Sequence, residues 1–167
     1  MTHRKILVCA WILVPFVGIS CSPGTPPSEK PAASPTATSE ELLPNGEPKE
    51  VTVQHCLIAF QGSLGDQPVR RTKEEAEALA KDLMKMLEAG DKFDEIVRQF
   101  TDDSAPGIYS MANHGVPADP TRSVSPRGGM VAAFGDVGFK LQVGEYGLAE
   151  YDPEKSKFGW HIIKRIK

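Results

Sequence analysis

The distribution of proline divides this chain into a part that can fold and a part that cannot. Seven of its 14 prolines fall between residues 22 and 50, where serine, threonine, alanine and glutamate fill most of the other positions. Such a segment buries too little apolar surface to offset its ordering entropy, and proline keeps it extended. The sequence therefore predicts a disordered linker over residues 21–50 and a single folded domain over residues 51–167.

The first 20 residues have the pattern of a signal peptide. A basic start, Met1–Lys5, precedes an apolar run from Ile6 to Ile19. A run of about 14 residues is shorter than the ~20 that span a bilayer, but it suits the core of a signal peptide.

The apolar run ends at Cys21, and small residues before a cysteine resemble the processing site of bacterial lipoproteins. We expect cleavage before Cys21 and lipid on that residue. The protein would then be exported and anchored in a bacterial cell envelope, on its periplasmic or extracellular face. Ordinary secretion is the alternative interpretation.

Charge and cysteine content limit the remaining classes. A net charge of −3 argues against a nucleic-acid partner, which would require a clustered basic face. Cys9 would leave with the signal peptide and Cys21 would carry lipid, so Cys56 remains alone and the mature domain has no internal disulfide. A lone cysteine within an apolar strand pattern predicts a small buried residue.

The folded part predicts an α+β arrangement with a small antiparallel sheet. β-branched residues indicate a strand over residues 51–60, and the apolar spacing after Thr72 and Glu75, which fit a capping box, indicates a helix that ends at Gly90. The later elements are a helix over 93–100, an irregular segment over 101–129, a helix over 130–137, a strand after Gly144 and a terminal strand over 160–166.

Three motifs follow one another in the folded part. They are His55-Cys56-Leu57-Ile58, then Phe100-Thr101-Asp102-Asp103-Ser104, then Arg127–Phe134 with Val143-Gly144-Glu145 and Phe158–Lys164. In this order they resemble the parvulin family of peptidyl-prolyl cis/trans isomerases over residues 51–167. The resemblance implies a small antiparallel sheet wrapped by helices and non-covalent catalysis of rotation about X–Pro bonds, with no cofactor and no metal. The implied partners are unfolded or nascent exported polypeptides, and one small domain on a tether is expected to be a monomer.

The resemblance also implies the site. His55, Asp103 and His161 match the catalytic polar cluster of the family, and Met130 and Phe134 match walls of its proline pocket. Rotation of the amide transfers no proton or group, so neither a nucleophile nor a metal is required. Met130 and Phe134 are four residues apart, so on a helix they share one face.

The chain departs from the family pattern after Ser104. Parvulins carry a Gly-Gly-Asp-Leu-Gly-like segment there, whose leucine walls the pocket, and in this chain Ile108 and Met111 are both candidates for that role. Phe158 stands where some relatives have a hydroxyl residue, and Arg70-Arg71 predicts a solvated pair. Two functions stay open: an active isomerase that assists folding, or a catalytically weak or inactive parvulin-fold chaperone that binds peptides.

Overall fold

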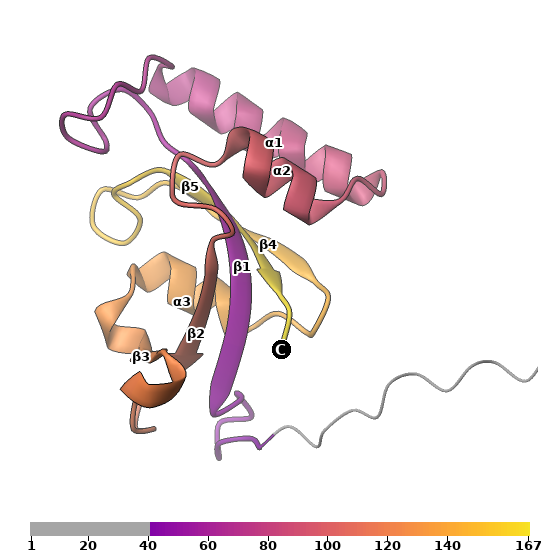
Figure 1. Cartoon of the computed structure of the whole chain (residues 1–167), viewed down its shortest axis with the longest axis vertical. Helices are drawn as coiled ribbons and strands as arrows, with labels where there is room; N and C mark the ends of the chain where they lie inside the picture. Colours follow the sequence, from indigo (N-terminus) through magenta and orange to yellow (C-terminus); the bar gives the residue numbers. More distant parts are fainter. Residues whose placement is uncertain (1–40) are drawn as a thin grey trace, which may run out of the picture. The chain divides into compact units, whose positions relative to one another are not determined.

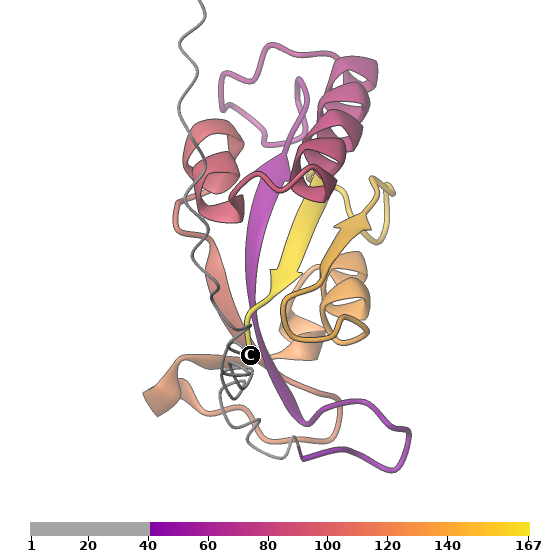
Figure 2. The ribbon, with the colours of Figure 1, turned by 90° about the vertical axis from the view of Figure 1, so that its right-hand side faces the viewer.

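The structure, a computed structural model, describes residues 41–167. A five-stranded sheet in the order β3-β2-β1-β5-β4 carries helices on both faces, which confirms the α+β prediction (Figures 1 and 2). The strands are β1 Glu50–Ile58, β2 Ile108–Ala112, β3 Val124–Pro126, β4 Tyr146–Ala149 and β5 Trp160–Arg165. The α-helices are α1 Lys73–Glu88, α2 Phe93–Phe100 and α3 Ala132–Gly138, with 3₁₀ turns at Pro120–Arg122 and Arg127–Gly129.

The sheet is antiparallel except at one edge. Strand β1 pairs antiparallel with β2 and β5, and β4 pairs antiparallel with β5, but β3 pairs parallel with β2. The sequence predicts an irregular segment over 101–129, so it misses β2 and β3. Both are short; β2 follows Gly107 and β3 ends in Pro126, and their extended backbone depends on pairing, of β2 with β1 and of β3 with β2.

Helix α1 begins and ends where the sequence predicts. The backbone N–H of Glu75 donates to the Thr72 hydroxyl at 3.2 Å, and the Thr72 N–H donates to the Glu75 carboxylate at 2.7 Å. After the helix, Gly90 takes a φ of 103°, which favours glycine. The buried face of α1 consists of Ala76, Ala80, Leu83 and Leu87.

Alternation along β1 gives the two sheet faces different roles. Cys56 and Ile58 pack with α1 and α2 in one core cluster, whereas Val51 and Val53 pack with Phe134 of α3 in another. Cys56 is fully buried, which confirms the prediction, and burial raises the pKa of its thiol to about 12. His55 lies between Val53 and Leu57, and therefore faces the α3 side.

Residues 41–49, which the sequence assigns to the linker, instead fold onto the domain. Leu42 and Pro48 form an isolated antiparallel bridge, and the side-chain amide of Asn113 donates to the Pro48 carbonyl at 2.9 Å and to the Glu47 carboxylate at 3.1 Å. Pro44 thus lies in a turn and Pro48 in the bridge that closes it, and a loop distant in sequence satisfies polar groups of this segment.

The predictions for residues 1–40 lie outside the described residues. They comprise the signal peptide over 1–20, lipidation at Cys21 and most of the linker. Among the helices of residues 41–167, none is long and apolar enough to cross a membrane.

Candidate active site

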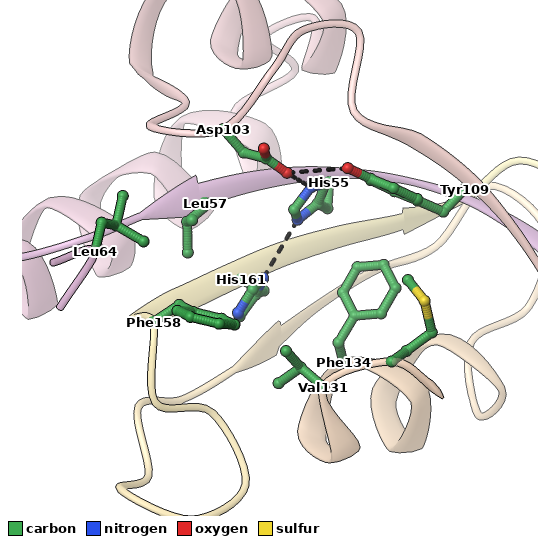
Figure 3. A pocket seen from close by; sticks show the side chains of 10 residues that line it. His55, Leu57, Leu64, Asp103, Tyr109, Val131, Phe134, Phe158 and His161 are labelled. Atoms are coloured by element: carbon green, nitrogen blue, oxygen red, sulfur yellow. Dashed lines mark hydrogen bonds and ion pairs between the residues drawn. The ribbon is translucent and has the colours of Figure 1, made fainter. Parts of the chain in front are cut away.

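Two neighbouring strands bring His55 and His161 together (Figure 3). The Nδ1 atoms of the two imidazoles are 3.3 Å apart, and the rings lie nearly parallel, with centroids 5.5 Å apart and an interplanar angle of 15°. Each side chain is buried. The two histidines that the sequence singles out, 106 residues apart, are therefore one hydrogen-bonded pair.

Asp103 extends this pair from the loop that follows α2. Its Oδ2 lies 3.0 Å from His55 Nε2, and the phenolic hydroxyl of Tyr109 donates to the same oxygen at 3.0 Å. Burial raises the pKa of Asp103, but the Ser104 backbone N–H, the Tyr109 hydroxyl and His55 stabilise the carboxylate more strongly, so the pKa lies below its usual value. The structure therefore brings together all three predicted polar residues and adds Tyr109.

The charge state of the site fixes the proton on each ring. Burial lowers the pKa of His55 despite the attraction of Asp103, and burial together with the neighbouring His55 lowers the pKa of His161 to about 3. Both imidazoles are therefore neutral near pH 7. A neutral His55 that donates from Nε2 to Asp103 must accept at Nδ1, so His161 donates from Nδ1.

This assignment leaves Nε2 of His161 as an acceptor. That atom is buried and has no hydrogen-bond partner within residues 41–167. A buried acceptor without a partner costs about 1–3 kcal/mol. Tyr109, Asp103, His55 and His161 thus form a continuous hydrogen-bonded chain. It ends at the unpaired Nε2 lone pair of His161.

The histidine pair forms part of the wall of a cavity of about 270 Å³. Met130, Val131 and Phe134 line it with apolar surface, and the Phe134 ring meets His55 edge-on at 5.2 Å and His161 at 5.7 Å. This is an apolar slot in direct contact with buried imidazoles.

Met130 and Phe134 both line this slot, but they do not share a helix face as the sequence predicts. Met130 closes the 3₁₀ turn Arg127–Gly129 with extended backbone (φ −96°, ψ 168°), and α3 begins two residues later at Ala132. The Met130 N–H bonds to the Arg127 carbonyl, so the turn, not a helix, sets its direction.

Tyr109, rather than Ile108 or Met111, supplies the wall that the sequence leaves unassigned. Ile108 is 49% exposed and Met111 is fully buried in the core beside Val53 and Phe134; neither lines the cavity. The Tyr109 ring meets Phe134 edge-on at 6.1 Å.

A signal for Tyr109 was present in the sequence. It stands two residues after Gly107, the position that leucine occupies after the second glycine of the family segment. Gly107 itself has a φ of 64°, and a Cβ there would lie 2.5 Å from the His55 carbonyl oxygen. Only glycine therefore fits against β1 at this point.

Arg127 stabilises the segments that surround the slot. Its guanidinium donates to Glu47 at 3.0 Å, to Asn113 at 2.8 Å and to Asp136 of α3 at 2.7 Å, and it lies 4.6 Å from the Phe139 ring centroid. One buried cation thus joins the segment 41–49, the loop after β2 and the helix that carries Phe134.

Two further expectations concern charged groups. Arg71 is not solvated as predicted, because its guanidinium bonds to the Asp102 carboxylate and the Ala59 carbonyl, whereas Arg70 is exposed. In the described part of the chain, no three histidine, cysteine, aspartate or glutamate side chains are grouped to hold a metal. The expectation of catalysis without a cofactor stays a prediction.

A comparison with protein families matches this architecture. The model of the PPIC-type PPIase domain matches residues 42–166, nearly all of the described chain. The chain belongs to the parvulin, or PPIC-type, peptidyl-prolyl isomerase family. The match begins eight residues before Glu50, the start of β1, in keeping with the folded segment 41–49.

Individual relatives agree with the family assignment. The chain is 32% identical over 123 residues to a protein named "Chaperone SurA" from Chromohalobacter salexigens, covering 71% of this chain and 24% of that protein. It is 30% identical over 129 residues to "Foldase protein PrsA 4" from Bacillus cereus, covering 77% of this chain and 35% of that protein. The chain thus spans about a quarter to a third of the curated relatives it matches.

The solved structure of the peptidyl-prolyl isomerase ESS1 from Candida albicans shares the fold. Its TM-score with this chain is 0.50 at 22% sequence identity, over 72% of this chain and 67% of that structure. At this identity the likeness supports the parvulin fold alone.

Proposed function

We propose that this parvulin is an active peptidyl-prolyl cis/trans isomerase that assists the folding of exported proteins. The observation that carries the proposal is the contact between an apolar slot and a buried neutral histidine pair, with Phe134 edge-on to His55 and His161. The slot accepts the pyrrolidine ring, and the histidines face the amide that precedes it.

The geometry lowers the rotation barrier without covalent chemistry. Amide resonance sets that barrier at ~20 kcal/mol. The slot binds the pyrrolidine ring of proline and moves the preceding carbonyl out of bulk water. This environment favours the twisted amide over the planar isomers, because resonance is lost in the twisted form and its nitrogen becomes pyramidal. Polar groups that fit this state better than either planar isomer contribute directly to the rate. We assign that role to His55 and His161, with Asp103 and Tyr109 holding their tautomers.

The alternative of a weak or inactive chaperone rested on the missing pocket wall. Tyr109 now occupies that position, so the alternative is not favoured. The names of the two relatives, a chaperone and a foldase, support polypeptides that are still folding as clients, and we expect these to be exported chains with X–Pro bonds.

Anchoring and assembly are part of the same proposal. A lipid on Cys21 would place the domain on a cell-envelope membrane, with residues 22–40 as a spacer, and the protein would act as a monomer. Metabolic labelling with a fatty-acid probe should mark the wild type and leave Cys21→Ala unmarked. Light scattering of the purified chain should return the mass of one copy.

The test of activity is a protease-free isomerisation assay on the full chain. Phe134→Leu removes the edge of the slot and keeps most of the core volume, and should lower kcat/KM at least about tenfold. Phe93→Leu is the matched control, because Phe93 is an equally buried phenylalanine of the other core cluster. Circular dichroism checks both folds. Equal activity in the two variants, or none in the wild type, would refute the proposal.

A further inference from the structure

We propose that the same cavity holds a second, apolar subsite, formed by Leu64 and Phe158, for the side chain of the residue before proline. This inference rests on the proposed isomerase function and defines its substrates. The protein would select X–Pro bonds in which X is a large apolar residue and would disfavour acidic or phosphorylated X.

The cavity has apolar surface on both sides of the histidine pair. Figure 3 shows Leu64 and Phe158 on the opposite side of His161 from Phe134. Both line the cavity, as does Leu57 of β1, which Figure 3 shows between Leu64 and His55. Leu64 and Phe158 are partly exposed, so their apolar surface is available to a ligand.

Ser63 links the two segments that carry Leu64 and Phe158. Its hydroxyl donates to the Phe158 carbonyl at 2.9 Å and accepts from the Phe60 N–H at 3.1 Å. The loop that carries Leu64 is thereby fastened to the turn that carries Phe158, across 95 residues of sequence. Gly159, at a φ of 139°, packs against the Ile58 backbone where a Cβ has no room. A preformed wall binds with little ordering cost.

The order of polar and apolar groups decides which substrate residue enters the subsite. The amide that rotates lies between the proline ring and residue X, and it must face the polar groups that act on it. Those groups, His55 and His161, lie between the two apolar sides of the cavity. With proline beside Phe134, the side chain of X falls beside Leu64 and Phe158.

The charges around the cavity exclude an acidic residue as the preferred occupant. None of the residues that line it is a cation at neutral pH, and the carboxylate of Asp103 is part of its wall. Arg71 is bound to Asp102, and Arg70 lines a separate surface depression with Gln67. The Lys157 ammonium lies 5.1 Å from the Phe158 ring centroid but does not line the cavity. A negative charge on X would therefore lose hydration beside apolar side chains and the Asp103 carboxylate.

The experiment compares peptides with Leu, Ala or Glu before proline on the full chain. Wild type should process Leu–Pro about tenfold faster in kcat/KM than Ala–Pro, with Glu–Pro slowest, because each methylene in such a pocket contributes measurably. Leu64→Ala should remove most of the Leu-over-Ala preference. Leu42→Ala, at a 54% exposed leucine outside the cavity, should keep the preference.

The second part of the experiment introduces a positive charge into the subsite. Leu64→Lys should raise the Glu–Pro to Leu–Pro ratio at least about tenfold, because a close opposite charge then meets the substrate. Wild-type activity that is equal for all peptides, or highest for Glu–Pro, would overturn the subsite and leave the isomerase function standing. No acceleration of any peptide would overturn the proposed function, and this inference with it.

Discussion

Mild acid should destabilise this domain through its buried histidines, and His161 should carry a measurable share. The side chain of His161 is buried, and burial together with His55 lowers its pKa from 6.5 to about 3. In the unfolded chain the same imidazole binds a proton below about pH 6.5, whereas the native one stays neutral. The unfolded state therefore binds more protons, so stability is complete above about pH 6.5 and falls as the pH drops toward 3.

The size of the effect follows from the two pKa values. Between about pH 7.5 and pH 5, one histidine shifted in this way removes about 2 kcal/mol from the free energy of unfolding. His55, whose pKa burial also lowers, adds to the loss in the same direction. Asp103 acts in the same direction but at lower pH: its lowered pKa contributes stability that is lost as the pH falls below the usual pKa of aspartate.

Urea unfolding of wild type and His161→Asn at the two pH values isolates the histidine. The asparagine amide keeps a donor near the position of Nδ1 and cannot titrate in this range. The variant should lose about 2 kcal/mol less than wild type on acidification, whatever its absolute stability. If both proteins lose the same amount, or the wild type loses none, then His161 is not a buried neutral base and the tautomer assignment fails.

Three other substitutions test the supports of the site. Gly107→Ala should destabilise the domain and reduce activity, because its Cβ meets the His55 carbonyl, whereas Gly115→Ala, with positive φ and open space, should cost only about 1 kcal/mol in urea unfolding and spare activity. Tyr109→Phe should raise the pKa of Asp103 and move the acid limb of the kcat/KM profile to higher pH. Glu47→Ala should lower the free energy of unfolding by about 1–3 kcal/mol, since it removes one of the two carboxylates that pair with the buried Arg127 guanidinium.

The sequence determines the elements with strong local signals. The capping box of Thr72 and Glu75 and the apolar spacing behind it predict α1, and the β-branched run before Ile58 predicts β1. The motif order predicts the family. These signals depend on residues close in sequence, whose effects on backbone conformation are largely independent of the rest of the fold.

The site could be predicted only where single residues matched the family. His55, Asp103, His161, Met130 and Phe134 all line one cavity, as that match implies. The sequence does not predict Tyr109, because it predicts no strand at β2. It places Arg71 in solvent, because the partners of Arg71, Asp102 and Ala59, come near only in the folded chain.

Tertiary structure alone decided where the domain begins and how the polar groups of the site are hydrogen-bonded. Glu47 belongs to the domain because Asn113 and Arg127 reach it across more than 60 residues. The tautomers of the histidine pair follow from burial and from the carboxylate of Asp103, neither of which is encoded next to a histidine. Hydrogen bonds and desolvation depend on distances between elements, and those distances exist only once the sheet has paired.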